Sequence, residues 1–364
     1  MLQFWVKYLI PACLLLSATV AAQTAADRLV IERYNTQNGL THAHVYQVFQ
    51  DSRGFIWIVT GDALMLYDGS LFLTVMRWDL ANSPQDSRLL FEDDAGRIWL
   101  RRGKTHFLVD IRSLEVTECG ILLKDRVAGQ IDCAVKGDNG IVSMVTDANR
   151  IYRYNVLKDQ VSSTDYTRPA SEYIIGSGEM VWFFNENTLL EDHITHRLNL
   201  SDLKTYGVDH VIPGLVKLLS GGRLGGISNE GLVISNPDNT VSRLKIAGHS
   251  DVYKINIALV GCTLPAPSEE NGKYCWVYFQ GKLLRVNIRD NKVDDFTELY
   301  GLSSLPMVFD VLKDRNGAYW IATSDGLVKT YRIPQRFRKY VWQDPEITKS
   351  APKNSCRGIT QARN

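Results

Sequence analysis

The chain has 364 residues, of which 45% are apolar, and its 41 basic and 40 acidic residues leave a net charge of +1. This balance gives no reason to expect a nucleic acid or an anionic membrane surface as partner. The apolar content suffices for a large core, and no stretch after the first 22 residues reaches the roughly 18 consecutive apolar residues that a transmembrane helix needs.

Met1–Ala22 has the features of a secretory signal peptide. A single basic residue, Lys7, precedes an apolar stretch that runs to Val20, and small residues lead to a cleavage point before Gln23. We therefore expect an exported, periplasmic chain without membrane insertion once the signal is removed. An uncleaved membrane anchor is the alternative.

Asp27–Asn35 predicts an isolated strand, and a turn at Asn38-Gly39-Leu40 follows it. The next stretch, Asp51–Gly69 (DSRGFIWIVTGDALMLYDG), alternates turn-forming Asp and Gly residues with apolar runs. With its flanks it predicts four antiparallel strands, at His44–Gln50, Phe55–Thr60, Leu64–Tyr67 and Leu71–Met76. One such sheet cannot bury its own apolar faces, so it must be repeated or packed against another element.

This unit occurs seven times. Asp314–Tyr331 (DRNGAYWIATSDGLVKTY) matches the first copy closely, and weaker copies begin at Asp93, Lys136, Gly176, Ser220 and Glu270. The turn glycines of the seven copies are 38 to 50 residues apart: Gly54, Gly96, Gly140, Gly178, Gly222, Gly272 and Gly317. Such a period is typical of a four-stranded propeller blade. We predict an all-β fold over residues 23–342, a seven-bladed β-propeller of four-stranded antiparallel blades.

Residues 343–364 are polar and aperiodic, which predicts a disordered tail. Two segments compete to complete the last blade. Arg336–Trp342 could supply its own outer strand, or Leu29–Tyr34 could be borrowed from the N-terminus, which would remove a free sheet edge. The sequence leaves both open.

Five copies carry a tryptophan at the equivalent strand position: Trp57, Trp99, Trp182, Trp276 and Trp320. The third and fifth copies have Ser143 and Gly225 there. We expect these tryptophans to be structural and to fill the space between neighbouring blades.

Five cysteines follow the signal segment, and no CxxC spacing indicates a zinc site. Cys262 ends one predicted strand and Cys275 begins the next, so a disulfide between them is one option in an oxidising compartment. A bridge between Cys119 and Cys133 is a weaker option.

Antiparallel pairing places all the Asp-x-x-Gly turns at one end of the blades, which we call the Asp-turn end. The second turn of each blade and the connections between blades lie at the other end, the second-turn end. Binding residues concentrate in loops on a rigid scaffold, so we expect a ligand at the second-turn end. The candidate ligand-binding residues are Trp78, Asp79, Arg101, Arg102, Lys104, Asn149, Asn185, Asn187, Asn229, Glu230 and Asp325. Trp78, beside Asp79, is the candidate for an exposed aromatic side chain that stacks on a sugar.

No pattern indicates catalysis, a metal or a cofactor. His193 and His196 stand three apart on a predicted strand, where they point to opposite faces, and His42 with His44 has no third ligand nearby in the sequence. The chain has no Gly-x-Ser-x-Gly, no His-Glu-x-x-His and no phosphate-binding glycine loop.

The first and last copies closely resemble the two-component regulator propeller repeat. That repeat runs Gly-Leu, a Val-x-x-Ile strand, Asp-x-x-Gly-x-x-Trp-Ile-Gly-Thr, then Gly-Leu and Tyr-Asp-Gly. In the first copy the matching residues are Gly39, Leu40, Val45, Val48, Asp51, Gly54, Trp57 to Thr60, Leu64 and Tyr67 to Gly69. In the last copy they are Gly301, Leu302, Val308, Val311, Asp314, Gly317, Trp320 to Thr323, Gly326, Leu327 and Tyr331.

This resemblance implies a periplasmic sensor for a small molecule or oligosaccharide. Similar proteins carry such propellers, usually two in tandem, ahead of a transmembrane helix and a cytoplasmic histidine kinase or diguanylate cyclase. We therefore expect a non-enzymatic ligand-binding module in two-component-type signalling, whose partner is a membrane sensor kinase or cyclase, or a second propeller. The sequence shows no output domain of its own, and a truncated product, a stand-alone receptor and a fragment stay open.

Two other classes of protein share this scaffold. One is an enzyme of the streptogramin-lyase-like or polysaccharide-degrading type, which needs a histidine and a carboxylate converging near the ring axis. The other is an interaction scaffold without a signalling role.

Overall fold

A computed structural model describes residues 28–78, 87–169, 171, 173–177, 180–188, 191–200, 202–213, 217–219, 223–228, 231–236, 238, 240–244, 257–263, 273–279, 281–290 and 292–333. By its internal contacts the chain divides into two compact units. One is Ile31–Tyr331, and the other combines Met1–Val30 with Arg332–Asn364, of which residues 28–30 and 332–333 are described. The fold and the sites below belong to the first unit.

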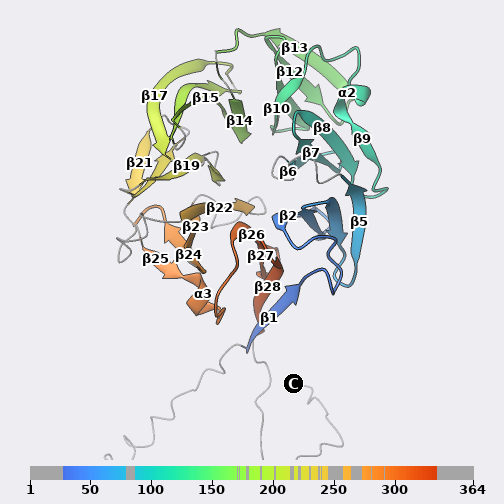
Figure 1. Ribbon diagram of the computed structural model, residues 1–364. Coiled ribbons are helices and arrows are strands. Elements are labelled where there is room, and N and C mark those ends of the chain that lie inside the picture. Colours follow the sequence, from blue (N-terminus) through green and yellow to red (C-terminus); the bar gives the residue numbers. More distant parts are fainter. Residues whose placement is uncertain are drawn as a thin grey trace, which may run out of the picture. The chain divides into compact units, whose positions relative to one another are not determined.

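The first unit is a seven-bladed β-propeller with antiparallel blades, as the sequence predicts (Figure 1). Blade 1 contains β2 (Val45–Gln50), β3 (Ile56–Thr60), β4 (Ala63–Tyr67) and β5 (Phe72–Arg77). Blade 2 contains β6 (Ser87–Glu92), β7 (Arg97–Arg102), β8 (Thr105–Asp110) and β9 (Val116–Glu118). Blade 3 contains β10 (Ile131–Lys136), β11 (Ile141–Thr146), β12 (Arg150–Asn155) and β13 (Gln160–Asp165). Blade 4 contains β14 (Tyr173–Ser177), β15 (Met180–Thr188), β16 (Glu191–Asn199) and β17 (Thr205–Pro213).

The remaining three blades complete the ring. Blade 5 contains β18 (Lys217–Leu219), β19 (Arg223–Ser228), β20 (Gly231–Ser235) and β21 (Val241–Leu244). Blade 6 contains β22 (Ile257–Thr263), β23 (Tyr274–Phe279), β24 (Lys282–Asn287) and β25 (Val293–Asp295). Blade 7 contains β26 (Val308–Lys313), β27 (Tyr319–Thr323), β28 (Gly326–Ile333) and β1 (Arg28–Tyr34). The strands predicted for blade 1 agree with the observed ones to within one residue at each end.

The N-terminal strand β1 completes blade 7, because the strand order there is β1-β28-β27-β26. The Tyr34 ring stacks on Trp320, with centroids 6.1 Å apart. Glu32 accepts a hydrogen bond from the Tyr331 hydroxyl (3.0 Å) and pairs with Lys329 (3.1 Å). Of the two closing segments that the sequence leaves open, the structure thus uses Leu29–Tyr34, and the competing segment, residues 336–342, lies outside the described residues.

A parallel pairing joins blades 6 and 7 at their inner strands. Gly261 of β22 stands opposite Asp310 of β26, and Cys262 stands opposite Val311. The two blades therefore form one eight-stranded sheet.

Two short helices, which the sequence does not predict, follow the outer strands of blades 2 and 6: α2 (Cys119–Leu122) and α3 (Phe296–Leu299). The Asp295 carboxylate caps α3 by accepting a hydrogen bond from the Glu298 N–H (3.1 Å). Phe296 packs edge-on against Trp276, with centroids 5.0 Å apart. The helix thus covers the core of its blade.

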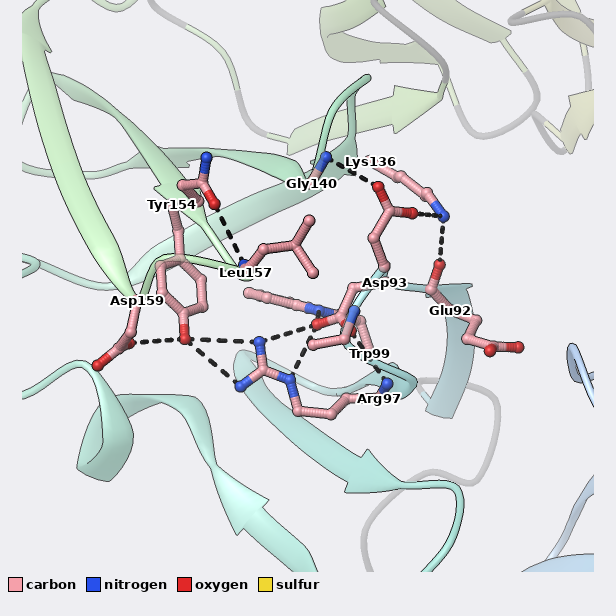
Figure 2. A network of polar contacts seen from close by, with 12 residues as sticks. Glu92, Asp93, Arg97, Trp99, Lys136, Gly140, Tyr154, Leu157 and Asp159 are labelled. Atoms are coloured by element: carbon pink, nitrogen blue, oxygen red, sulfur yellow. Dashed lines mark hydrogen bonds and ion pairs between the residues drawn. The ribbon is translucent and has the colours of Figure 1, made fainter.

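The Asp turn explains why Asp, Gly and Trp recur at fixed spacing. In blade 2, Asp93 Oδ1 accepts hydrogen bonds from the Ala95 and Arg97 N–H groups (3.0 Å each), which shapes the turn (Figure 2). Its other oxygen accepts from the Trp99 indole Nε1–H (3.0 Å). Gly96 closes the turn with φ of +78°, a conformation that favours glycine.

The same turn occurs in blades 1 and 7, where Asp51 and Asp314 accept from Trp57 (3.0 Å) and Trp320 (2.9 Å). Positive φ values are also observed at three other predicted turn glycines, Gly54, Gly140 and Gly317. Gly178, Gly222 and Gly272 lie outside the described residues.

The five repeat tryptophans are buried, and four of them pack between neighbouring blades: Trp57, Trp99, Trp276 and Trp320. Trp57, Trp99 and Trp182 are fully buried, and Trp276 and Trp320 are 3% and 2% exposed. Trp57 packs against Ile98 and Leu100 of the next blade. Truncation of such a residue to Ala typically costs about 3 to 5 kcal/mol.

The cysteine pairings suggested by the sequence are wrong. Cys119, Cys133 and Cys275 are buried free thiols. Cys275 packs with Leu232 and Ile234 of blade 5, whereas the backbone of Cys262 pairs with β26. Burial raises the pKa of the Cys275 thiol to about 12, which keeps it protonated.

Candidate functional site

Several inner strands carry one extra residue close to the second-turn end. Their registers shift between Val45 and Gln47, Leu89 and Phe91, Ile131 and Cys133, and Val308 and Asp310. A bulge leaves one residue outside the ladder and re-aims its side chain. In blades 1, 3 and 7 these extra residues are Tyr46, Asp132 and Phe309.

Hydrogen bonds tie the second turns to the chain that enters each inner strand. Gly61 N–H donates to His44 O (3.0 Å), and Ser324 N–H donates to Met307 O (2.9 Å). The bulges therefore lie at the second-turn end, on the strands nearest the centre of the ring (Figure 1).

Four aromatic side chains gather where blades 1 and 7 meet, and we call His42, His44, Tyr46 and Phe309 the aromatic group. The Tyr46 and Phe309 rings have centroids 5.0 Å apart. His44 lies 6.1 Å from Tyr46 and 5.3 Å from His42, centroid to centroid. His44 is exposed and the other three are half-buried. Such a group offers ring faces for stacking, with imidazole nitrogens and a phenol hydroxyl for hydrogen bonds.

A second cluster of polar side chains joins blades 2 and 3 at the same end. Asp132, the bulge residue of β10, forms an ion pair with Arg168. Burial raises the pKa of the Asp132 carboxyl, and the Arg168 charge opposes this shift. Asp147 Oδ1 accepts a hydrogen bond from the Gln130 N–H (2.8 Å), and the Gln130 side chain donates to Lys104 O (2.8 Å).

Arg101 and His106 stand opposite each other on β7 and β8 in the same junction. His106 is 3% exposed, and neither of its ring nitrogens has a hydrogen-bond partner among the described residues. Burial, with a contribution from the Arg101 charge, lowers the pKa of His106 to about 4. The imidazole is therefore neutral at neutral pH. Arg101 is half-buried, and its Nε likewise has no partner.

Trp78 is not the exposed aromatic platform that the sequence suggests. It is 6% exposed, its Nε1–H donates to Gly61 O (2.9 Å), and its ring packs with Trp57 and Leu64. The guanidinium of Arg102 lies 5.3 Å from its centroid. The residue enters the core because the chain leaving β5 folds back over the second turn of blade 1, with Trp78 N–H donating to Asp62 O (3.0 Å).

The other candidates fall into three sets. Arg101, Lys104 and Asn149 come together at the junction of blades 2 and 3, where Asn149 has φ of +55° and its Oδ1 accepts from the Arg168 N–H (3.3 Å). Asn185, half-buried on β15, and Asp325, exposed in the second turn of blade 7, lie on other blades. Asp79, Asn229 and Glu230 lie outside the described residues, as does the side chain of Asn187.

Sequence reasoning missed Tyr46, His106, Asp132, Arg168 and Phe309. Tyr46, Asp132 and Phe309 are placed by bulges, and His106 is placed by a buried cross-strand pair. Both features depend on register and leave no local pattern in the sequence. For Tyr46, Asp132 and Phe309, the position near the start of an inner strand was the available signal.

In the described part of the chain, none of the side chains of His42, His44, His106 and His196 forms a hydrogen bond or ion pair with a carboxylate. No cluster of three or more metal-ligating residues occurs among the described residues. In the same residues, no helix has the length and apolar character to span a membrane.

Comparison with known proteins identifies the repeat. Residues 39–62 match the family model of the two component regulator propeller. No curated protein sequence matches this chain.

Solved structures share the fold at low identity. The extracellular domains of two hybrid two-component systems of B. thetaiotaomicron align at 13% and 16% identity, with TM-scores of 0.52 and 0.53. The alignments cover 83% and 84% of this chain but 39% and 42% of those domains, so the chain spans about two fifths of their length. Virginiamycin B lyase from Staphylococcus aureus aligns at 12% identity and a TM-score of 0.51, over 83% of this chain and 99% of the lyase.

These likenesses establish the propeller fold, and the matched segment coincides with the turn from Gly39 and the first two strands of blade 1. The propeller is similar to extracellular domains of two-component regulators. The chain is thus a seven-bladed propeller in which residues 39–62 match the two component regulator propeller repeat.

Proposed function

We propose that this chain is the extracytoplasmic ligand-binding part of a two-component-type signalling system, and that it binds a small molecule or oligosaccharide without turning it over. The observation that carries the proposal is the aromatic group. Three of its members, His42, His44 and Tyr46, lie in the segment that the family model matches, and Phe309 lies on β26 of blade 7. The group is at the second-turn end of the ring.

The chemistry of the two clusters suits a sugar-like ligand. The faces of Tyr46 and Phe309 can stack on the apolar face of a pyranose ring. The polar cluster of Lys104, Asp132 and Arg168 supplies donors and acceptors for hydroxyl groups. The rigid blades fix both clusters, which lowers the ordering cost of binding.

The chain would then act with a partner that carries the output domain, either a membrane sensor kinase or cyclase or a second propeller.

The signal-like segment Met1–Ala22 supports export, and the similar B. thetaiotaomicron domains are extracellular. N-terminal sequencing of the chain recovered from the periplasm should begin at Gln23. Recovery with Met1 in the membrane fraction would instead support an uncleaved anchor.

The binding test is calorimetric titration of the purified chain with a panel of neutral and charged oligosaccharides and small metabolites. We expect saturable binding of one class of ligand, and at least a tenfold weaker affinity in the double variant Tyr46→Ala/Phe309→Ala. Leu71→Ala, on a residue 71% exposed beside β5, is the matched control and should bind like the parent. A double variant that folds and binds with unchanged affinity would move the site elsewhere.

The chemical fate of the bound ligand distinguishes a sensor from an enzyme. The likeness to virginiamycin B lyase is as strong as that to the sensor domains. Prolonged incubation should return the bound ligand chemically unchanged, as followed by NMR. Conversion of the ligand would establish the enzyme instead.

A further inference from the structure

Blade 4 keeps the repeat tryptophan but lacks the aspartate that holds it in other blades. In blades 1, 2 and 7 the indole N–H donates to an aspartate six residues earlier in the chain. Six residues before Trp182 the chain has Gly176. Trp182 is fully buried, and its Nε1 has no hydrogen-bond partner among the residues that the structure describes.

An arginine stands opposite this tryptophan on the neighbouring strand. Arg197 of β16 is in register with Trp182 of β15 and with Tyr206 of β17, so the three side chains share one face of the blade. Arg197 is 7% exposed, and its Nε and one terminal nitrogen are buried with no hydrogen-bond partner in the described part of the chain. Its guanidinium lies 4.9 Å from the centroid of the Tyr206 ring.

Arg197 takes part in no ion pair within the described part of the chain. Among the described residues, the acidic side chain whose pKa the Arg197 charge affects is Asp238, on the exposed turn after β20. The pKa of Asp238 is lowered mainly by its hydrogen bonds with Thr240 and only slightly by Arg197. A guanidinium buried to this degree is costly without an anion or hydrogen-bond acceptors.

In blade 2, an aspartate carboxylate accepts hydrogen bonds from the equivalent tryptophan and from an arginine. There the Asp93 carboxylate accepts from the Trp99 indole N–H (3.0 Å) and from Arg97 Nε (3.0 Å), with the Arg97 terminal nitrogen also at 3.0 Å (Figure 2). One carboxylate thus bridges an indole and a guanidinium. Blade 4 has the indole and the guanidinium without the carboxylate.

The chain cannot supply that carboxylate from the position used in the other blades. A Cβ atom at Gly176 would collide with Cys133 Sγ and with the Val135 side chain of blade 3. Glycine is therefore required where the repeat has aspartate, and the acceptor must come from elsewhere.

We propose that Trp182 and Arg197 form an anion site that takes the carboxylate group of a small ligand. The carboxylate would accept from the Trp182 Nε1–H and from Arg197, as Asp93 does in blade 2, with Tyr206 holding the guanidinium in place by stacking. The site lies near the Asp-turn end, because Trp182 is the third residue of β15 and Arg197 the third from the end of β16. It is thus separate from the second-turn end and does not depend on the proposed function.

The test is thermal unfolding of the purified chain in sodium acetate and in sodium chloride at the same pH and ionic strength. Acetate should raise the Tm saturably above the chloride series, because a ligand of the native state stabilises it by mass action. Arg197→Gln should abolish this difference, and Trp182→Phe, which removes the indole N–H, should weaken acetate binding at least tenfold.

Two controls separate the site from general effects. Trp99→Phe removes an indole that Asp93 already satisfies, so it should lower the Tm yet keep the full response to acetate. Tyr46→Ala in the aromatic group should also keep it, which distinguishes failure of this site from failure of the proposed function. Sodium phosphate is the third series, and a rise with phosphate but not acetate would contradict the carboxylate assignment.

A measurement on the parent chain tests the proposal even if the variants do not fold. Saturation-transfer NMR should show magnetisation passing from the protein to the acetate methyl protons, with competition by formate. No transfer, or an equal response to acetate in a folded Arg197→Gln variant, would overturn the proposal.

Discussion

Asp93 shows at the scale of one residue how a turn and a core position depend on a single carboxylate. It is 3% exposed and accepts hydrogen bonds from two backbone N–H groups, the Trp99 indole and the Arg97 guanidinium. Asp93→Asn should lower the free energy of unfolding by about 3 to 5 kcal/mol, because it leaves Arg97 without its anion. Urea denaturation measures this change.

The neighbouring Asp94 is the matched control. Its carboxylate pairs with Lys136 (2.7 Å) but is 35% exposed. Asp94→Asn should therefore cost less than about 1 kcal/mol. Equal losses in the two variants would mean that the carboxylate of Asp93 contributes no more than a surface charge.

His106 makes stability depend on pH. Its pKa is lowered from 6.5 to about 4 in the folded chain, chiefly by burial. Between these two values the unfolded chain binds the proton and the folded chain does not, so stability is complete above 6.5 and falls as the pH drops toward 4. A shift of this size corresponds to a loss on the order of 3 kcal/mol.

Replacing His106 removes that dependence. His106→Phe should flatten the fall in unfolding free energy between pH 6.5 and 4, measured by urea denaturation at each pH. An unchanged slope in His106→Phe would show that other groups cause the fall.

At the scale of the element, strand positions could be predicted and their registers could not. The strands of blade 1 follow from alternating turn residues and apolar runs, which are local features. The bulges that expose Tyr46 and Phe309 depend on how two strands pair, and the burial of Trp78 depends on the path of the following loop. The absence of an aspartate before Trp182 was visible in the sequence, but the arginine opposite it required the register of β15 with β16.

Substitution of Tyr34 can measure how much strand β1 contributes to the free energy of unfolding. Tyr34 stacks on Trp320 and packs against Phe72 at 5.2 Å, centroid to centroid. Tyr34→Ala should lower the free energy of unfolding by about 2 to 4 kcal/mol, since it opens a cavity over the blade 7 tryptophan. Arg33→Ala, one residue away and exposed, should change it by less than about 0.5 kcal/mol. A small loss at Tyr34 would mean that β1 adds little to blade 7.

At the scale of the whole molecule, the number of blades follows from counting turn glycines, whereas the closure of the ring does not. Both termini offered a strand with suitable alternation. The choice rests on contacts such as Tyr34 with Trp320 and Glu32 with Lys329, which link residues about three hundred positions apart in the chain.

Because β1 closes the ring, its removal should change how the propeller unfolds and whether it associates. A chain that begins at Arg28 keeps this strand, and we expect a single sharp unfolding transition and a monomer. A chain that begins at Thr36 leaves the edge of β28 without its neighbour and uncovers the Trp320 face, so its transition should broaden and the protein should associate through the open edge. Calorimetry with size-exclusion chromatography distinguishes the two chains. If the shorter chain unfolds as sharply as the longer one and remains monomeric, a segment other than β1 can close the ring.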